Sequence, residues 1–194
     1  MPWVRTLDEN DVTGALRQAY EADLARLGFV MEATRALSLR PELATALDAF
    51  TAAVKQVSAL TPHERRLISL LVAHRLRSTY CVLVYAVDVE RDLGGLDRVR
   101  AVLHDYRTAG LDARTVAILD YALAAAAGHP VAAQVDRLRA VGLDDGAIID
   151  VAVWATLRAL RSRVYEALGV ETDPFFLEQA DLVEAVLGDG TQPA

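Results

Sequence analysis

Apolar residues recur at a helical spacing along almost the whole chain, and this pattern constrains the fold more than any other feature. In residues 11–28 the apolar positions share one face, and Gly28 follows where a helix is expected to end. These positions are Leu16, Tyr20, Leu24 and Leu27. No segment shows the two-residue alternation of a half-buried strand, and no Asn-Gly hairpin turn occurs. We therefore predict an all-α fold.

Proline and capping residues set the expected helix ends. Thr61, Pro62 and Glu64 have the pattern of an N-cap, a first helical residue and a capping box. Pro41 fits the first turn of another helix. The predicted helices cover residues 11–28, 40–57, 61–78, 81–95, 96–107, 112–130, 131–142, 144–168 and 173–188. We expect one domain, 1–194, with N-terminal helices in 8–57, a core motif in 60–95 and C-terminal helices in 112–187.

Composition and charge exclude several classes of function. The net charge of −7 disfavours a nucleic-acid surface. No apolar run reaches the roughly 18–20 residues that span a bilayer, and the first residues lack the apolar core of a signal peptide, so we expect a cytoplasmic protein. A single cysteine excludes an internal disulfide and a cysteine-cluster zinc site. The four histidines lack metal-ligand spacing, and we expect no metal and no cofactor.

The single cysteine lies in the stretch 75–87, which reads RLRSTYCVLVYAV. If residues from 81 onward are helical, Cys81 and Tyr85 lie one above the other, and Ser78 lies one turn earlier. The positive end of the helix dipole would lower the pKa of the thiol, whereas burial among apolar neighbours would raise it. Two interpretations therefore remain open: a reactive thiol, or a small buried apolar residue.

A second candidate cluster lies in the long helix predicted over 144–168. Arg158 and Arg161 are three residues apart, so they share a face. That face is simply the polar side of the helix, or it receives an anion. Three aromatic residues are expected to be core or interface residues rather than ligand contacts. They are Trp154, Phe175 and Phe176.

The stretch 60–94, LTPHERRLISLLVAHRLRSTYCVLVYAVDVERDLG, resembles the core of the AhpD-like, or carboxymuconolactone decarboxylase, superfamily. The similarity is greatest to its peroxidase-related branch. Residues 12–43, the segment AGLDARTVAILDYAL and the segment EALGVETDPF also resemble that branch, so the similarity covers about residues 7–176. The resemblance implies an orthogonal helical bundle.

The resemblance also implies positions for a redox site, of which three are altered. Active members of the family use two cysteines, a glutamate and a histidine to reduce peroxides. The second cysteine falls on Cys81, but Ser78 replaces the first cysteine, Tyr85 replaces the histidine and Arg66 replaces the glutamate. Glu64 is two residues away and near the opposite face of its helix. The first hypothesis is therefore a diverged peroxidase-related protein with little or no dithiol peroxidase activity.

Two alternatives use the same positions. In a one-cysteine thiol peroxidase, an external thiol would reduce oxidised Cys81, Arg66 would stabilise the thiolate, and Tyr85 would donate a hydrogen bond to the peroxide. A decarboxylase-like enzyme is the weaker alternative, because no histidine is placed to act as its base. The ligand would be a small hydroperoxide or an anion.

We also expect a homo-oligomer, either a dimer or a trimer or hexamer. The family resemblance implies such assembly, and the segment 151–160, VAVWATLRAL, is apolar over more than one narrow face. Its apolar residues are Val151, Val153, Trp154, Leu157 and Leu160. An apolar surface too large for one subunit to cover normally marks an interface.

Overall fold

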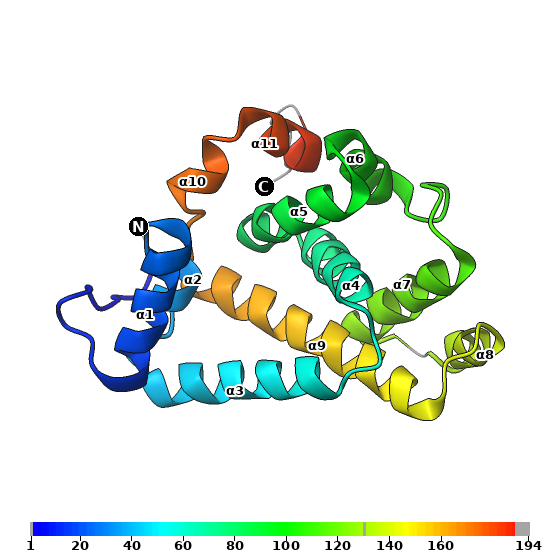
Figure 1. The fold of residues 1–194 in the computed structure, drawn as a ribbon, viewed down its shortest axis with the longest axis horizontal. Helices are drawn as coiled ribbons and strands as arrows, with labels where there is room; N and C mark the ends of the chain where they lie inside the picture. Colours follow the sequence, from blue (N-terminus) through cyan, green and yellow to red (C-terminus); the bar gives the residue numbers. More distant parts are fainter. Residues whose placement is uncertain (1, 130, 189–194) are drawn as a thin grey trace.

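The computed structural model describes residues 2–129 and 131–188, which form eleven α-helices without a strand (Figure 1). The predicted all-α class is therefore confirmed. The helices are α1 (Gly14–Leu27), α2 (Glu32–Arg35), α3 (Pro41–Val57), α4 (Pro62–Arg75), α5 (Thr79–Leu93), α6 (Leu96–Asp105), α7 (Ala113–Ala126), α8 (Ala132–Ala140), α9 (Asp145–Leu168), α10 (Pro174–Leu177) and α11 (Ala180–Leu187). None of these helices is long and apolar enough to span a bilayer.

The predicted capping residues form the helix ends. The Thr61 hydroxyl accepts a hydrogen bond from the Glu64 N–H at 3.1 Å, and the Glu64 carboxylate accepts one from the Thr61 N–H at 2.7 Å. Asp112 and Asp144 each accept from the backbone N–H three residues on, at 2.9 and 2.8 Å. The sequence Gly-Leu-Asp occurs at 110–112 before α7 and at 142–144 before α9, and in both places it forms a helix-to-helix turn whose aspartate is the N-cap.

Helix α4 lies at the centre of the bundle, where it packs against α5, α7 and α9. Its apolar residues are buried almost all round, as expected of a central helix. Helices α6 and α11 cover α5 on the side away from α3 (Figure 1). The long helix α9 crosses the molecule and offers its other side to α3.

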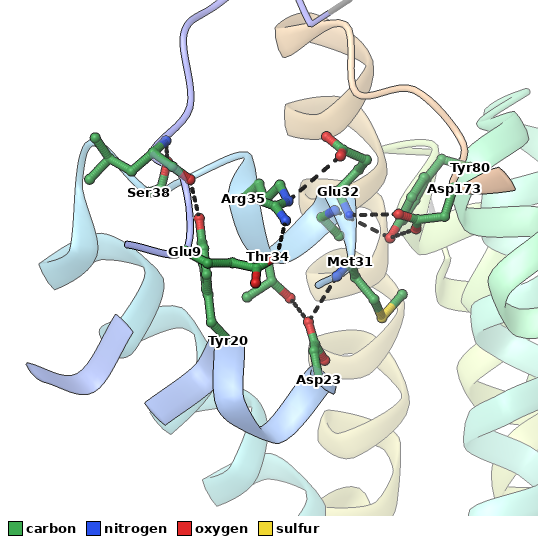
Figure 2. Close-up of polar contacts among 12 residues, drawn as sticks. Glu9, Tyr20, Asp23, Met31, Glu32, Thr34, Arg35, Ser38, Tyr80 and Asp173 are labelled. Carbon is green, nitrogen blue, oxygen red and sulfur yellow. Dashed lines mark hydrogen bonds and ion pairs between the residues drawn. The ribbon is translucent and has the colours of Figure 1, made fainter. Parts of the chain in front are cut away.

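Helices α1, α2 and α3, here called the N-terminal helices, form a separate wall beside α9 (Figure 1). They have a small core cluster of their own, made by Val12, Leu16, Tyr20 and Val30. Polar contacts fix the start of α2 to the rest of the bundle (Figure 2). Asp173 accepts from the Glu32 N–H at 3.0 Å and from the Tyr80 hydroxyl at 3.2 Å, and that hydroxyl accepts from the Ala33 N–H.

Three details of secondary structure differ from the prediction. Helix α2 was not predicted, and α5 begins at Thr79, two residues earlier than expected, with Ser78 as its N-cap. The helix predicted over 173–188 is interrupted at Gln179, whose φ of −84° and ψ of 77° are not helical. The interruption lets Phe176 of α10 and Leu182 of α11 both be buried. Pro130, at the predicted end of the α7 helix, lies outside the described residues.

The exposed apolar surface lies on α3 more than on α9. Of the five apolar residues singled out on α9, Val151, Trp154 and Leu157 are buried inside the subunit, whereas Leu160 is 50% exposed. On α3, three residues seven positions apart are exposed on one face. They are Leu43, Phe50 and Val57, with exposed fractions of 61%, 50% and 75%.

Candidate functional site

A tight turn between α4 and α5 positions the candidate site. The Ser78 N–H donates to the Ala73 carbonyl and the Arg77 N–H to the His74 carbonyl, each at 3.0 Å, which ends α4 in a Schellman motif. Arg77 stands at the left-handed position, with φ of 56°, where glycine is usual. Ser78 then begins α5 directly, so Cys81 lies in its first turn.

Cys81 is buried, with 1% of its surface exposed, between two serines from different helices. Ser78 at the N-cap of α5 and Ser162 on α9 are also fully buried, and neither hydroxyl has a hydrogen-bond partner of normal geometry. Burial raises the pKa of the Cys81 thiol, although Ser162, Ser78 and the Arg158 charge act in the opposite direction. Desolvation therefore outweighs the groups that favour the thiolate, and the thiol is protonated at neutral pH.

Cys81 and Tyr85 face a cavity of about 550 Å³ between the N-terminal helices and the helices α5 and α9. This volume lies within the range of small-molecule pockets, about 300–1,000 Å³. From α9, Arg158, Arg161 and Tyr165 line the same cavity. Burial raises the pKa of Tyr85, so its hydroxyl stays neutral at physiological pH.

Arg158 is the buried cation of this cavity, with 7% of its surface exposed. Its Nη1 atom donates to the Tyr85 hydroxyl at 3.0 Å, and its guanidinium carbon lies 4.2 Å from the centroid of the Trp154 ring. Its Nε and Nη2 atoms are buried without any hydrogen-bond partner. Within residues 2–129 and 131–188, no carboxylate forms an ion pair with it.

Arg161, one turn further along α9, is differently placed. Its Nη2 atom contacts the Asp48 carboxylate and the Thr51 hydroxyl on α3, and its Nη1 atom donates to the Tyr165 hydroxyl at 3.1 Å. Its Nε atom is buried and unpartnered. Arg161 thus connects α9 to α3 and closes one side of the cavity.

The structure does not bring Arg66 to this site. Its Nε and Nη2 atoms pair with both oxygens of Asp92 on α5, at 2.6 and 2.7 Å, and His63 lies 3.2 Å from the same carboxylate. Arg66 is thus not among the residues that line the cavity beside Cys81, and its guanidinium group is occupied by Asp92. Glu64 is held by its cap and by Arg114, whose Nε atom lies 2.9 Å away. In the described part of the chain, no three His, Cys, Asp or Glu side chains are grouped to hold a metal ion.

Sequence reasoning missed how deeply Arg158 is buried and that Tyr165 lines the site. One signal was available: Trp154, Arg158, Arg161 and Tyr165 recur at three- and four-residue spacing along α9. An aromatic residue one turn before an arginine can cover its guanidinium group, as Trp154 does here.

Neither a protein-family model nor a curated protein matches the sequence. Solved structures do match. An alkylhydroperoxidase AhpD core, an uncharacterized peroxidase-related protein from Ralstonia eutropha JMP134, is 22% identical and superposes with a TM-score of 0.81 over 90% of this chain and 94% of the other. The chain has the AhpD-like fold. An uncharacterized peroxidase-related protein from Silicibacter sp. TM1040 shares this AhpD-like fold, with 24% identity and a TM-score of 0.75 over 88% and 93% of the two chains.

The debrominase Bmp8 has the same fold. It is 17% identical to this chain, and its apo structure superposes with a TM-score of 0.75 over 93% of this chain and 96% of its own. A second structure shows a cysteine-to-alanine variant of Bmp8 in complex with 2,3,4-tribromopyrrole, with the same identity and TM-score. These similarities establish the architecture expected from the residue pattern around Cys81.

Proposed function

We propose that this chain is a diverged AhpD-like, peroxidase-related protein that binds a small molecule in the cavity over Cys81 and has little or no dithiol peroxidase activity. The observation that carries the proposal is that Cys81, the only cysteine, is buried beside Ser78. A dithiol cycle needs a second thiol to attack the oxidised cysteine and release it as a disulfide. The Ser78 hydroxyl cannot make that bond.

The residues at the positions of the family's acid–base relay, Tyr85 and Arg66, do not suit that chemistry either. Burial keeps the thiol protonated, and a thiol is a much weaker nucleophile than a thiolate. The ordinary pKa of a tyrosine is about 10, and burial raises the pKa of Tyr85 above this value. It is therefore a poor base at neutral pH. Arg66 is committed to Asp92 and does not face the thiol.

The cavity itself supports a small-molecule ligand. It lies between two layers of helices and is lined mainly by apolar atoms, with three arginines and two aspartates among its lining residues. The debrominase complex with 2,3,4-tribromopyrrole provides a precedent for a small aromatic molecule bound by a protein of this fold. That complex supports a ligand of similar size for the cavity described here.

Peroxide consumption tests the proposal. Wild type and Cys81→Ala are compared with hydrogen peroxide and cumene hydroperoxide, with dithiothreitol as the reductant. We expect the two proteins to consume peroxide at the same background rate. Robust turnover that disappears in Cys81→Ala would refute the proposal.

A one-cysteine thiol peroxidase is the second candidate, and the polar groups around the thiol favour it. Ser78, Ser162 and the Arg158 charge all favour the thiolate, although burial outweighs them. In this reaction the thiolate attacks the peroxide, which leaves a sulfenic acid and an alcohol. Two external thiols then restore the cysteine as water and a disulfide are released. Trapping of the sulfenic acid by dimedone after peroxide treatment, detected by mass spectrometry, would support this candidate.

A decarboxylase-like activity remains the weaker alternative. Among the described residues, no histidine lines the cavity to act as a base. The two carboxylates that line it, Asp23 and Asp48, each contact an arginine.

A further inference from the structure

We propose that Arg158 anchors a small organic monocarboxylate whose apolar part occupies the cavity between the N-terminal helices and helices α5 and α9. This inference rests on the proposed function, because it uses the same cavity and names the chemical class of its ligand. It does not require Cys81 to react.

The unpartnered atoms of Arg158 are the first reason. A guanidinium group has five N–H donors, and here Nη1 reaches Tyr85 while Nε and Nη2 are buried without acceptors. A buried charge without a counter-ion is strongly unfavourable. Nε and Nη2 lie on the same edge of the guanidinium plane, which is the edge that a carboxylate binds with two parallel hydrogen bonds.

The charge balance of the cavity is the second reason. Its lining includes two carboxylates and three arginines. Asp23 contacts Arg26 at 3.1 Å, and Asp48 contacts Arg161, so each carboxylate already has a cation. Arg158 is the cation left over. One unpaired positive charge matches a ligand with one negative charge better than a dicarboxylate.

The surroundings of Arg158 strengthen its attraction for an anion. Lys55 on α3 has its pKa lowered by burial and then by the positive charges of Arg158, Arg65 and Arg161. That shift indicates that positive charges gather around Lys55, and two of them, Arg158 and Arg161, line the cavity. Asp48 acts on the pKa of Lys55 in the opposite direction.

The apolar walls define the rest of the ligand. Side chains from all three N-terminal helices and from α5 face the space, and the largest of them include Met31, Leu47 and Val84. Tyr80, Tyr85 and Tyr165 add aromatic surface. An aromatic acid or a medium-chain fatty acid would place its carboxylate at Arg158 and bury its ring or chain against these walls.

Calorimetric titration tests this inference with octanoate and benzoate as the anionic probes. Their neutral counterparts, octanamide and benzamide, have nearly the same shape without the charge. We expect the wild-type protein to bind at least one acid about ten-fold or more tightly than its amide. Arg158→Met should weaken that acid about ten-fold or more and leave the amide unchanged. The matched control is Arg163→Met, because Arg163 is exposed on the same helix and should bind like wild type.

Each outcome decides the inference. Equal affinity for acid and amide, or unchanged acid binding by Arg158→Met, would overturn it, and the cavity would still be a small-molecule site. If the wild-type protein binds none of the four probes, the inference is overturned as well, whatever the peroxide assay shows. If Arg158→Met does not fold, Arg158→Lys decides: it keeps the charge but loses the planar fork, so acid binding should weaken while amide binding stays. Cys81→Ala should bind the acid like wild type, which separates this result from any thiol chemistry.

Discussion

Replacement of Arg158 by methionine is expected to stabilise the protein when no ligand is bound. The arginine leaves Nε and Nη2 buried without partners, at about 1–3 kcal/mol for each unsatisfied group, and buries a charge without a carboxylate. Two contacts of Arg158 stabilise the folded protein. The charged hydrogen bond to Tyr85 contributes about 1.5–3 kcal/mol, and the contact with the Trp154 ring contributes about 2 kcal/mol. Methionine keeps much of the apolar stem of the arginine. We therefore expect the free energy of unfolding of Arg158→Met to be about 1–2 kcal/mol higher than that of wild type.

Thermal unfolding followed by far-ultraviolet circular dichroism measures this gain. For a chain of this length, about 1–2 kcal/mol corresponds to a rise in Tm of about 2–8 °C. The buffer must contain no organic acid, because a carboxylate bound at Arg158 would stabilise wild type alone. Arg163→Met should change the stability by less than about 0.5 kcal/mol. A Tm for Arg158→Met below that of wild type would refute the reasoning, because it would show that the buried guanidinium is satisfied without a ligand.

Four further predictions concern other parts of the chain. Arg77→Gly should raise the free energy of unfolding by about 0.5–1 kcal/mol, because glycine adopts the left-handed φ of 56° without steric cost; a loss in chemical denaturation would contradict this. Because burial raises the folded pKa of Cys81, the contribution of this thiol to stability should be complete below the unfolded thiol pKa of about 8.5 and be lost as the pH rises through the folded pKa; the Tm of Cys81→Ser should therefore fall less than that of wild type over this pH range. Arg66→Ala should cost less than about 1 kcal/mol, because its ion pair is partly exposed, and iodoacetamide should label Cys81 at an unchanged rate. Light scattering should show a homo-oligomer that Phe50→Asp dissociates, whereas a wild-type mass near 21 kDa would exclude assembly.

Local chemistry made much of the helical framework predictable. The capping box at Thr61 and Glu64 and the N-caps Asp112 and Asp144 depend only on residues three positions apart, so sequence patterns specify them. The common face of Cys81 and Tyr85 likewise follows from helix geometry. The break at Gln179 was not predictable in this way, because the burial of Phe176 and Leu182 depends on distant helices.

The surroundings of Arg66 and Arg158 could not be predicted from their neighbours in the sequence. Arg66 occupies a position suggested by resemblance, but its partner Asp92 is 26 residues away and holds it on the surface between α4 and α5. Arg158 has the sequence context of a polar helix face, yet the packing of α9 against the bundle buries it over Trp154. Whether an arginine faces solvent or a cavity is decided by tertiary packing, which no spacing within one helix reveals.

The position of Cys81 behind the N-terminal helices makes it a built-in reporter of local opening. Cys81 is 1% exposed, so labelling by a reagent requires a local opening, for example a movement of α1–α3 away from α5 and α9 that breaks the contact between Arg161 and Asp48. With one cysteine in the chain, each labelled molecule records one opening event. Comparison of the labelling rate with that of the unfolded chain therefore gives the free energy of this partial opening separately from global unfolding. A molecule bound in the cavity would make these openings rarer and so slow the labelling of Cys81. Its binding could therefore be followed without any assay of turnover.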